Sequence, residues 1–386
     1  MNYANLATHR LMVRDETRTA AFQKAIAATV KPGDVVVDVG AGCGILSLFA
    51  AQAGAARVYA VERDPGVAGF AQRLAAENGF SQIVRVIPAD IRLAGIAEKA
   101  SVIVSEWMGT IGVEENMYGA VLWARDNLLA PGGRMIPQSV TAMAAPAAPA
   151  QRADLRFFAD GCYGLDLKAL SEPSVVELLL TRRRVLPEDL AAPPQALWTS
   201  NAATDPPDMV RNPLHAELTF KAGRQTKANS IALWFEADLG GGVTLRNAPD
   251  APDTHWGQML LPLDRTFPFG RGDRLKVGIT VWPVGPGPLM FAWRWQINDA
   301  PALQLDTVGG AGVPTSPSPS LAEIPTERSE LSRFLARLAV DPERLQAFLA
   351  DPDKAMAELP PAYADALKSG DPYQIGTALY GRKAEA

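Results

Sequence analysis

Residues 35–44 of the chain read Val35-Val36-Val37-Asp38-Val39-Gly40-Ala41-Gly42-Cys43-Gly44 and indicate the fold class of its N-terminal part. A short, continuous run of β-branched residues is typical of a buried parallel strand, and the glycines after it let the backbone turn tightly and approach a ligand. The apolar residues 45–51 then predict a helix that crosses back over the sheet. Apolar runs at 58–61, closed by Glu62, and at 102–104 repeat this pattern, so residues 1–137 are predicted to form an α/β domain around a parallel sheet.

The glycine loop and the acids near it indicate which ligand this sheet binds. The loop spacing is G-x-G-x-G, whereas the dinucleotide fingerprint is G-x-G-x-x-G. Asp38, directly before the first glycine, adds negative charge that disfavours a pyrophosphate and suits a cationic amino-acid group. Glu62 ends the second strand, where an acid hydrogen-bonds both ribose hydroxyls, and Asp90 follows the third apolar run, where it can accept a hydrogen bond from an adenine amino group. An amino-acid end, a ribose and an adenine together predict S-adenosylmethionine as the cofactor. The glycines that would contact it are Gly40, Gly42 and Gly44.

A second loop, Ser105-Glu106-Trp107-Met108-Gly109, is followed by Glu115, nine residues after Glu106. A carboxylate matches one edge of a planar guanidinium through two parallel charge-assisted hydrogen bonds, so two carboxylates can hold one guanidinium from two sides. Most pairs of acids on loops are simply solvated, so the pair alone indicates little. It gains meaning from the cofactor loop that precedes it in the chain.

The sequence changes in character after Pro137. From residue 138 to about residue 300, apolar side chains take every second position, as at Phe291, Trp293 and Trp295. This alternation predicts an antiparallel β-barrel or sandwich. Residues 163–200 inside this region are more helical in character and are predicted to form an inserted excursion.

Two further segments complete the chain. Residues 301–328 are rich in glycine, proline and serine and are predicted to be a linker. Residues 329–386 are predicted to form a small α-helical domain, because Asp-Pro pairs provide an N-cap followed by proline at the first helical position. These pairs are Asp341-Pro342, Asp351-Pro352 and Asp371-Pro372.

The composition limits the classes of function. A chain of 386 residues with 48% apolar and 20% charged residues can form two or three ordinary globular domains. The net charge of −5 does not favour a nucleic-acid partner. Two cysteines provide no disulfide framework, and the sequence has neither a signal-peptide pattern nor an apolar run of about 18 residues. We therefore expect a cytoplasmic protein with no nucleic-acid partner, no membrane partner and no metal site.

With these loops in this order, the chain resembles the protein arginine N-methyltransferase family over roughly residues 3–300. The resemblance implies a Rossmann-like class I methyltransferase domain at 1–137. It further implies an antiparallel β-barrel domain on the substrate side at 138–300, with a dimerisation arm at 163–200 and assembly as a homodimer. The small α-helical C-terminal domain lies outside the resemblance. Four separated blocks carry it: His9 to Thr19, the glycine loop through Glu62, the loop with two glutamates through Asp126, and Thr254-His255-Trp256.

The resemblance also implies a role for each residue of the predicted site. Glu106 and Glu115 would clamp the target guanidinium. Asp15 and His255 would form a hydrogen-bonded pair between the two domains and accept the proton that the product loses. The remaining residues would line the cofactor or the substrate pocket. Arg18 would pair with the carboxylate of the cofactor. The residues that line the cofactor would be His9, Arg18, Asp38, Gly40, Gly42, Gly44, Glu62 and Asp90, and those that line the substrate pocket would be Met12, Met117 and Trp256.

One departure from the family pattern leaves the substrate open. The family commonly has tyrosine after Ser-Glu-Trp-Met-Gly, whereas this chain has Thr110. The first expectation is methylation of arginine in a protein or peptide. The alternatives are free arginine or another small guanidino metabolite, and a catalytically silent scaffold whose tail binds a partner.

Overall fold

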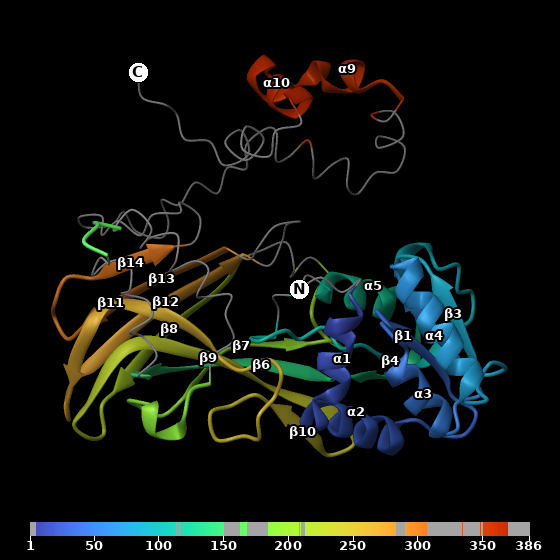
Figure 1. The fold of residues 1–386 in the computed structure, drawn as a ribbon, viewed down its shortest axis with the longest axis horizontal. Coiled ribbons are helices and arrows are strands. Elements are labelled where there is room, and N and C mark those ends of the chain that lie inside the picture. Colours follow the sequence, from blue (N-terminus) through green and yellow to red (C-terminus); the bar gives the residue numbers. More distant parts are fainter. Residues whose placement is uncertain are drawn as a thin grey trace. The chain divides into compact units, whose positions relative to one another are not determined.

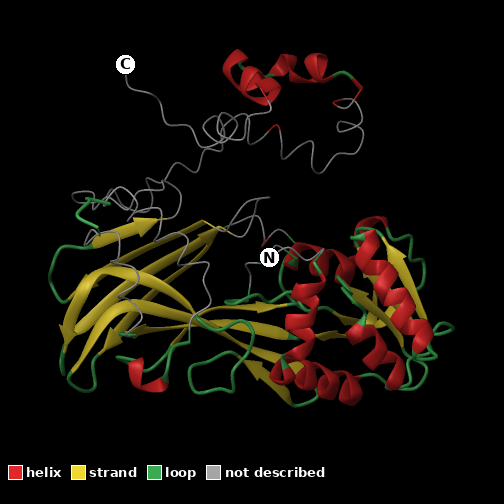
Figure 2. Cartoon of the chain, viewed as in Figure 1, coloured by secondary structure: helices red, strands yellow, loops and turns green. Residues whose placement is uncertain are grey.

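The structure, a computed structural model, describes residues 5–112, 115, 117–149, 163–167, 184–207, 209, 213–282, 290–306, 334, 348 and 350–369. The chain divides into two compact units, residues 1–317 and 318–386. The first unit holds a parallel sheet with its helices and a larger antiparallel region (Figure 2). The predicted α/β and β regions therefore pack together as one body.

A five-stranded parallel sheet forms the N-terminal part of the first unit, as predicted. Its strand order is β3-β2-β1-β4-β5, so the order reverses between β1 and β4. These two strands lie next to each other in Figure 1. The strands are β1 (Val35–Val39), β2 (Arg57–Glu62), β3 (Val84–Pro88), β4 (Ala100–Val104) and β5 (Leu129–Ile136). In open α/β sheets, ligands bind outside the carboxyl ends of the strands at such a reversal.

Several helices begin at a residue whose side chain accepts a hydrogen bond from a free backbone N–H group of the first turn. The Asp15 side chain accepts from the backbone N–H of Arg18 at the start of α2, and Asp64 accepts from Val67 at the start of α4, where Pro65 takes the first helical position. The helices of this part are α1 (Leu6–Arg14), α2 (Glu16–Thr29), α3 (Ile45–Gln52), α4 (Pro65–Glu77), the short 3-10 helix η1 (Ile91–Leu93) and α5 (Tyr118–Leu128).

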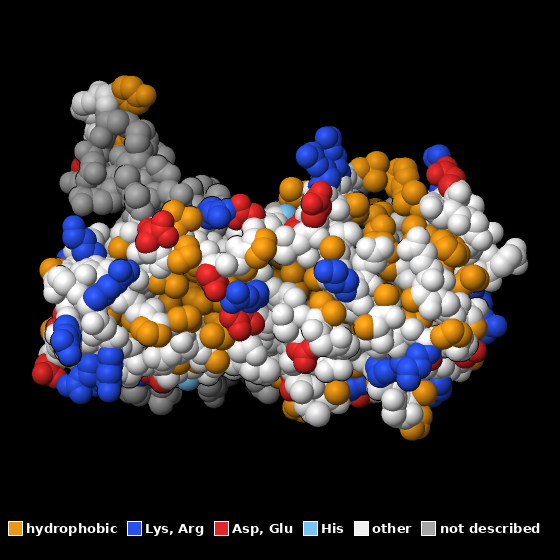
Figure 3. Space-filling view, turned by 90° about the horizontal axis from the view of Figure 1, so that it is seen from below, with side chains coloured by type: hydrophobic (Ala, Val, Ile, Leu, Met, Phe, Trp, Pro, Cys, Tyr) orange, Lys and Arg blue, Asp and Glu red, His pale blue; other side chains and the backbone are white. Residues whose placement is uncertain are grey.

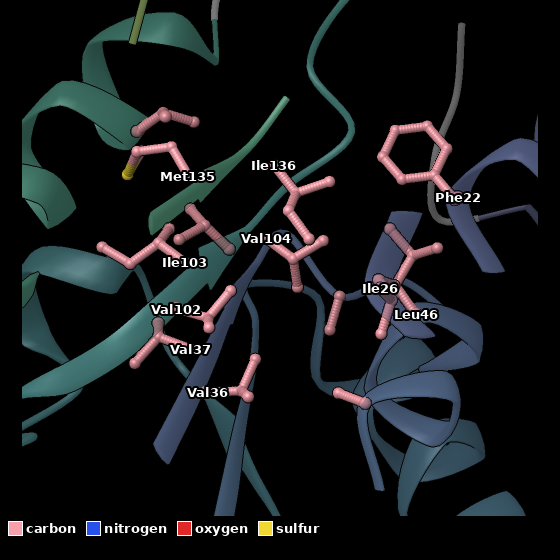
Figure 4. Packing of buried hydrophobic residues seen from close by; sticks show 14 of the residues in the cluster. Phe22, Ile26, Val36, Val37, Leu46, Val102, Ile103, Val104, Met135 and Ile136 are labelled. Atoms are coloured by element: carbon pink, nitrogen blue, oxygen red, sulfur yellow. The ribbon is translucent and has the colours of Figure 1, made fainter. Parts of the chain in front are cut away.

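The core of the α/β region lies between the sheet and these helices. Phe22 and Ile26 of α2 lie with Leu46 of α3 beside strand residues such as Val104 and Ile136 (Figure 4). Full burial of each such side chain contributes about 1.5–3 kcal/mol. This packing holds α2, and with it Asp15 and Arg18, against the edge of the sheet where β1 and β4 end.

The β region consists of antiparallel strands in two sheets, as the alternating pattern predicts. One sheet has the order β10-β9-β6-β7, with β11 also paired to β9, and the other has the order β14-β13-β12-β8. Phe291, Trp293 and Trp295 are buried in the core of this region. The strands are β6 (Ser139–Ala147), β7 (Gln195–Asn201), β8 (Leu214–Lys221), β9 (Thr226–Gly240), β10 (Val243–Arg246), β11 (Met259–Phe269), β12 (Arg274–Trp282), β13 (Met290–Ile297) and β14 (Leu303–Asp306); η4 (Pro187–Asp189) is a 3-10 turn.

Two strands lie in segments for which the sequence predicts a helical excursion and a linker. β7 occupies the end of the segment 163–200, predicted to be helical, and pairs with β6; the predicted helix at 174–184 lies almost entirely outside the described residues. β14 occupies the start of the predicted linker, because the alternation at 303–305 lets it pair with β13 before the Gly- and Pro-rich stretch begins. Here strand pairing outweighs local composition.

The second unit contains α9 (Pro352–Ala355), η7 (Met356–Glu358) and α10 (Pro361–Ser369). The Asp351 side chain caps α9 by accepting from the N–H of Lys354, so this Asp-Pro pair begins a helix as predicted. Phe334, Met356 and Leu359 form a small buried cluster. The other two Asp-Pro pairs lie outside the described residues.

Candidate active site

The loops after β1 and β4 lie side by side at the point where the strand order reverses. Asp38 of β1 is in register with Val104 of β4. The Ser105 hydroxyl donates to the carbonyl oxygen of Val39 at 2.7 Å, which ties the start of the glutamate loop to the end of β1. The glycine loop and the loop with two glutamates are therefore brought together, as a joint cofactor and substrate site requires.

The glycine loop is shaped for close approach. Gly40 and Gly42 have φ of 70° and 56°, a region that favours glycine. A Cβ on Gly42 would lie 3.0 Å from Cε1 of His9, and one on Gly40 would clash with the end of Met117. Two predicted site residues distant in sequence, His9 and Met117, thus pack directly on this loop.

Asp38 is a fully buried acid at the end of β1, beside the glycine loop. Burial raises its pKa to about 7, and the nearby charge of Glu62 adds to the rise, although the Ser47 hydroxyl donates to its Oδ2 at 2.6 Å. Its Oδ1 has no hydrogen-bond partner among the described residues. Glu62 accepts from the backbone N–H of Gly42 at 2.9 Å, so both acids lie against the glycine loop.

The raised pKa of Asp38 predicts how stability depends on pH without cofactor. Between about pH 4 and about pH 7 the folded state binds more protons than the unfolded state, so the free energy of unfolding falls as pH rises, by at most roughly 4 kcal/mol. Asp38→Asn removes this titration and should flatten the dependence. Thermal melting of both proteins across this window is the measurement; equal pH dependence in the two would contradict the assignment.

Arg18 and Glu106 form a buried ion pair between α2 and the glutamate loop. Nε and Nη2 of Arg18 lie 3.2 and 3.0 Å from Oε2 of Glu106, and the two side chains are 5% and 7% exposed. Glu106 Oε1 also accepts from the N–H of Met108, which holds the loop in shape. The pair joins the segment predicted to bind cofactor to the segment predicted to bind substrate.

The residues around the glycine loop suit S-adenosylmethionine. Nη1 of Arg18 is buried and has no hydrogen-bond partner among the described residues. A buried guanidinium nitrogen left in this way costs stability unless an anionic group pairs with it, and the cofactor's carboxylate is such a group. Asp38 offers an acceptor for the cofactor's amino group, and Glu62 for its ribose.

Asp15 and His255 are in contact although 240 residues separate them. Asp15 Oδ2 lies 2.7 Å from Nδ1 of His255 and also accepts from the His255 backbone N–H at 2.7 Å. Burial by itself raises the pKa of Asp15, but the bonds from His255 and from the N–H of Arg18 outweigh it, so this pKa lies below its usual range. Asp15 therefore stays ionised and orients the imidazole.

Replacing Asp15 by asparagine tests the role of this pair. The amide can still cap α2 through Oδ1, but its NH₂ group then faces the donors of His255, so the ring loses its orientation. We expect kcat to fall by about 10²- to 10⁴-fold. Asp64→Asn, the same change at the N-cap of α4, is the matched control and should retain activity. Rates measured at saturating substrates decide; equal rates in the two variants would remove Asp15–His255 from the mechanism.

The other predicted site residues lie in varied surroundings. Glu115 is half-buried in the turn before α5, and Met12 is half-buried on α1. Trp256 is fully buried, and its ring contacts those of His255 and Phe235 at centroid distances of 4.2 and 5.1 Å, so it supports His255 from the core. Asp90 accepts from the N–H of Arg92 and caps η1. The proposed places of Trp256 in the pocket and of Asp90 at the adenine stay predictions.

Three polar contacts near the site have no signal in the sequence. Ser47 holds Asp38, and the Tyr118 hydroxyl donates to Asp205 at 2.7 Å, joining α5 to the β region. Asn247 bonds to two loops at once. Each of these contacts links elements that are far apart in the chain or on opposite sides of a turn, so no local sequence motif predicts the contact.

On the face in Figure 3, acidic and basic side chains are interspersed, with basic ones in small groups. Among the described residues, no helix has the length and apolar character needed to cross a bilayer, and no cluster of three or more His, Cys, Asp or Glu side chains is arranged to hold a metal.

Known proteins share both halves of this arrangement. Residues 16–114 match the family model of ribosomal protein L11 methyltransferase, and residues 146–287 match that of the arginine methyltransferase oligomerization subdomain. The PRMT1 enzyme–prozyme heterotetrameric complex with AdoHcy from Trypanosoma brucei aligns with a TM-score of 0.72 and 26% identity over 79% of this chain and 99% of that chain. Protein arginine N-methyltransferase 6 of Xenopus laevis is 33% identical over 297 residues, 74% of this chain and 86% of the relative.

The parallel sheet, its strand order and the glycine loop at the reversal define a class I methyltransferase domain. A second relative, probable protein arginine N-methyltransferase 6 of Arabidopsis thaliana, is 32% identical over 67% of this chain and 69% of its own length. The chain belongs to the protein arginine N-methyltransferase family. The family resemblance that the sequence predicts is confirmed.

Proposed function

We propose that this protein transfers methyl groups from S-adenosylmethionine to a guanidino nitrogen of arginine in a protein or peptide. The observation that carries the proposal is the buried Arg18–Glu106 pair at the strand reversal, with one guanidinium nitrogen left for a cofactor carboxylate. This ion pair links cofactor binding to substrate binding. Arg18 is the residue predicted to bind the cofactor's carboxylate, and Glu106 is one of the two glutamates predicted to bind the substrate's guanidinium.

The chemistry assigns a task to each acid. S-adenosylmethionine supplies an electrophilic methyl group on a sulfonium and leaves as a neutral thioether. Glu106 and Glu115 hold the guanidinium and draw its positive charge toward the nitrogens they contact, which leaves the target nitrogen richer in electrons. The clamp also aligns that nitrogen with the methyl carbon, so that the C–N bond can form as the C–S bond breaks.

The product must lose one proton to keep a single positive charge. Asp15 fixes the Nδ1 side of His255, so Nε2 is the ring nitrogen that takes the proton, directly or through water. The resulting imidazolium is stabilised by the ionised Asp15 carboxylate. Met12 and Met117 would wall the pocket in which the methyl group is transferred.

We also propose that the protein works as a cytoplasmic homodimer. The match of residues 146–287 to an oligomerization subdomain supports the assembly. Tyr163 and Leu165, in the predicted dimerisation arm, are 93% and 63% exposed. Light scattering of the purified protein measures the mass in solution; a monomer at micromolar concentration would contradict the homodimer.

Labelled cofactor distinguishes the candidate substrates. The purified protein is incubated with methyl-labelled S-adenosylmethionine and either free arginine or a proteolysed proteome, and labelled peptides are sequenced. Label in arginine-containing peptides supports the proposal. Label in free arginine alone would indicate that the substrate is a small guanidino compound. A protein that binds the cofactor but transfers no methyl group would be a catalytically silent scaffold.

A further inference from the structure

Asn247, in the turn after β10, contacts both loops that carry the proposed substrate machinery. Its side-chain Nδ2 donates to the carbonyl oxygen of Thr110 at 2.9 Å and to the carbonyl oxygen of Gly257 at 2.7 Å. Thr110 lies between Glu106 and Glu115 in sequence, and Gly257 follows His255 by two residues. One amide group therefore bridges the loop that carries Glu106 and Glu115 and the loop that carries His255.

The amide is used almost to its full capacity. Both N–H donors are engaged, and Oδ1 accepts from the backbone N–H of Phe235 at 2.7 Å. Asn247 is 1% exposed, so water cannot readily replace these bonds. Removing the donors would leave two partly buried carbonyl groups without this partner, which costs free energy where access of water is restricted.

The bridge is fixed to a rigid part of the fold. Phe235 lies in the middle of β9, the strand that pairs with β6, β10 and β11. Gln258 donates to the backbone carbonyl oxygen of Asn247 at 2.6 Å, and the Phe235 ring contacts that of Trp256 edge to face. The amide is thus held by the sheet, and its hydrogen bonds fix both loops in position relative to β9.

We propose that Asn247 is a positioning residue for methyl transfer, which holds the loop of Glu106 and Glu115 in register with the loop of His255. The inference rests on the proposed function, since it concerns where the guanidinium and the proton acceptor lie relative to each other. A displacement of about 1 Å between such groups can lower turnover by about 10²-fold. The hydrogen bonds that Asn247 makes with Phe235, Thr110, Gly257 and Gln258 reach neither the glycine loop nor Arg18, so cofactor affinity should not change.

Two substitutions at this position and one elsewhere test the inference in the full-length protein. Asn247→Asp keeps the shape of the side chain and the bond from Phe235 but places an oxygen against two carbonyl oxygens. Asn247→Ser keeps a single donor on a shorter side chain, and it provides the test if Asn247→Asp does not fold. The matched control is Asn229→Asp, at a buried asparagine of β9 whose Oδ1 accepts from the Ser230 hydroxyl. The readouts are kcat and KM for the arginine substrate, Kd for cofactor by calorimetry, and the melting temperature.

We expect kcat per folded enzyme to fall about 10- to 100-fold in Asn247→Asp and less in Asn247→Ser, with Kd for cofactor within about twofold of wild type. Asn229→Asp should lose stability without losing turnover. Wild-type kcat in both Asn247 variants, or a loss of cofactor affinity in proportion to kcat, would overturn the positioning role alone. A wild-type protein that methylates no arginine would overturn the proposed function itself, and the two failures are therefore distinguishable.

Discussion

Replacing Glu115 by glutamine is expected to remove most methyl transfer while cofactor binding stays intact. The side chain keeps its size but loses the negative charge that draws the guanidinium charge away from the target nitrogen. Loss of one preorganised electrostatic contact of this kind lowers kcat by about 10²- to 10³-fold. Initial rates at saturating cofactor and substrate measure the effect, and calorimetry measures the affinity for cofactor.

The matched control for this change is Glu98→Gln. Glu98 pairs with Arg57 on the surface, where the two side chains are 37% and 50% exposed. Exposed pairs contribute at most about 1 kcal/mol, so this variant should fold and turn over like wild type. Retained turnover in Glu115→Gln, comparable to that of Glu98→Gln, would remove Glu115 from the clamp.

Replacing Arg18 by lysine is expected to weaken cofactor binding by about 30-fold or more. Lysine keeps the positive charge but cannot supply the planar fork that reaches Glu106 through two nitrogens and leaves Nη1 for a carboxylate. Truncating one partner of a buried charged contact typically costs about 2–5 kcal/mol, which corresponds to an increase in Kd of about 30-fold or more. Calorimetry with S-adenosylmethionine or its demethylated product is the measurement.

Arg57→Lys is the corresponding control, because Arg57 makes an exposed pair with Glu98. It should bind cofactor like wild type. An Arg18→Lys protein that is folded and binds cofactor within about threefold of wild type would show that another group holds the carboxylate. In that event Nη1 of Arg18, which has no hydrogen-bond partner in the described part of the chain, would need a different explanation.

The fold was largely predictable because its strongest elements have local patterns. Val35–Val39 is a continuous β-branched run closed by glycines, and Phe291, Trp293 and Trp295 alternate as a half-buried strand requires. β14 was not predictable in the same way. Its four residues owe their pairing with β13 to the neighbouring strand, whereas the Gly- and Pro-rich residues after them dominate the local composition.

The site was predictable to a lesser degree. Asp38 and Glu62 follow from their positions at strand ends, but the contact between Asp15 and His255 follows only from the family resemblance, since 240 residues separate them. The Arg18–Glu106 pair joins α2 to the loop after β4, and Asn247 bridges two loops that are far apart in the chain. Such contacts leave no period and no spacing in the sequence, so only the folded chain reveals them.

The most direct measurement is the location of the transferred methyl group. A peptide product formed by the wild-type protein is fragmented in a mass spectrometer, beside the product of Glu115→Gln under the same conditions. The methyl group is expected on a guanidino nitrogen of arginine with the wild-type protein and is expected to be nearly absent with the variant. A methyl group on lysine, on an amino terminus or on a carboxylate would contradict the guanidinium clamp, as would equal transfer by the two proteins.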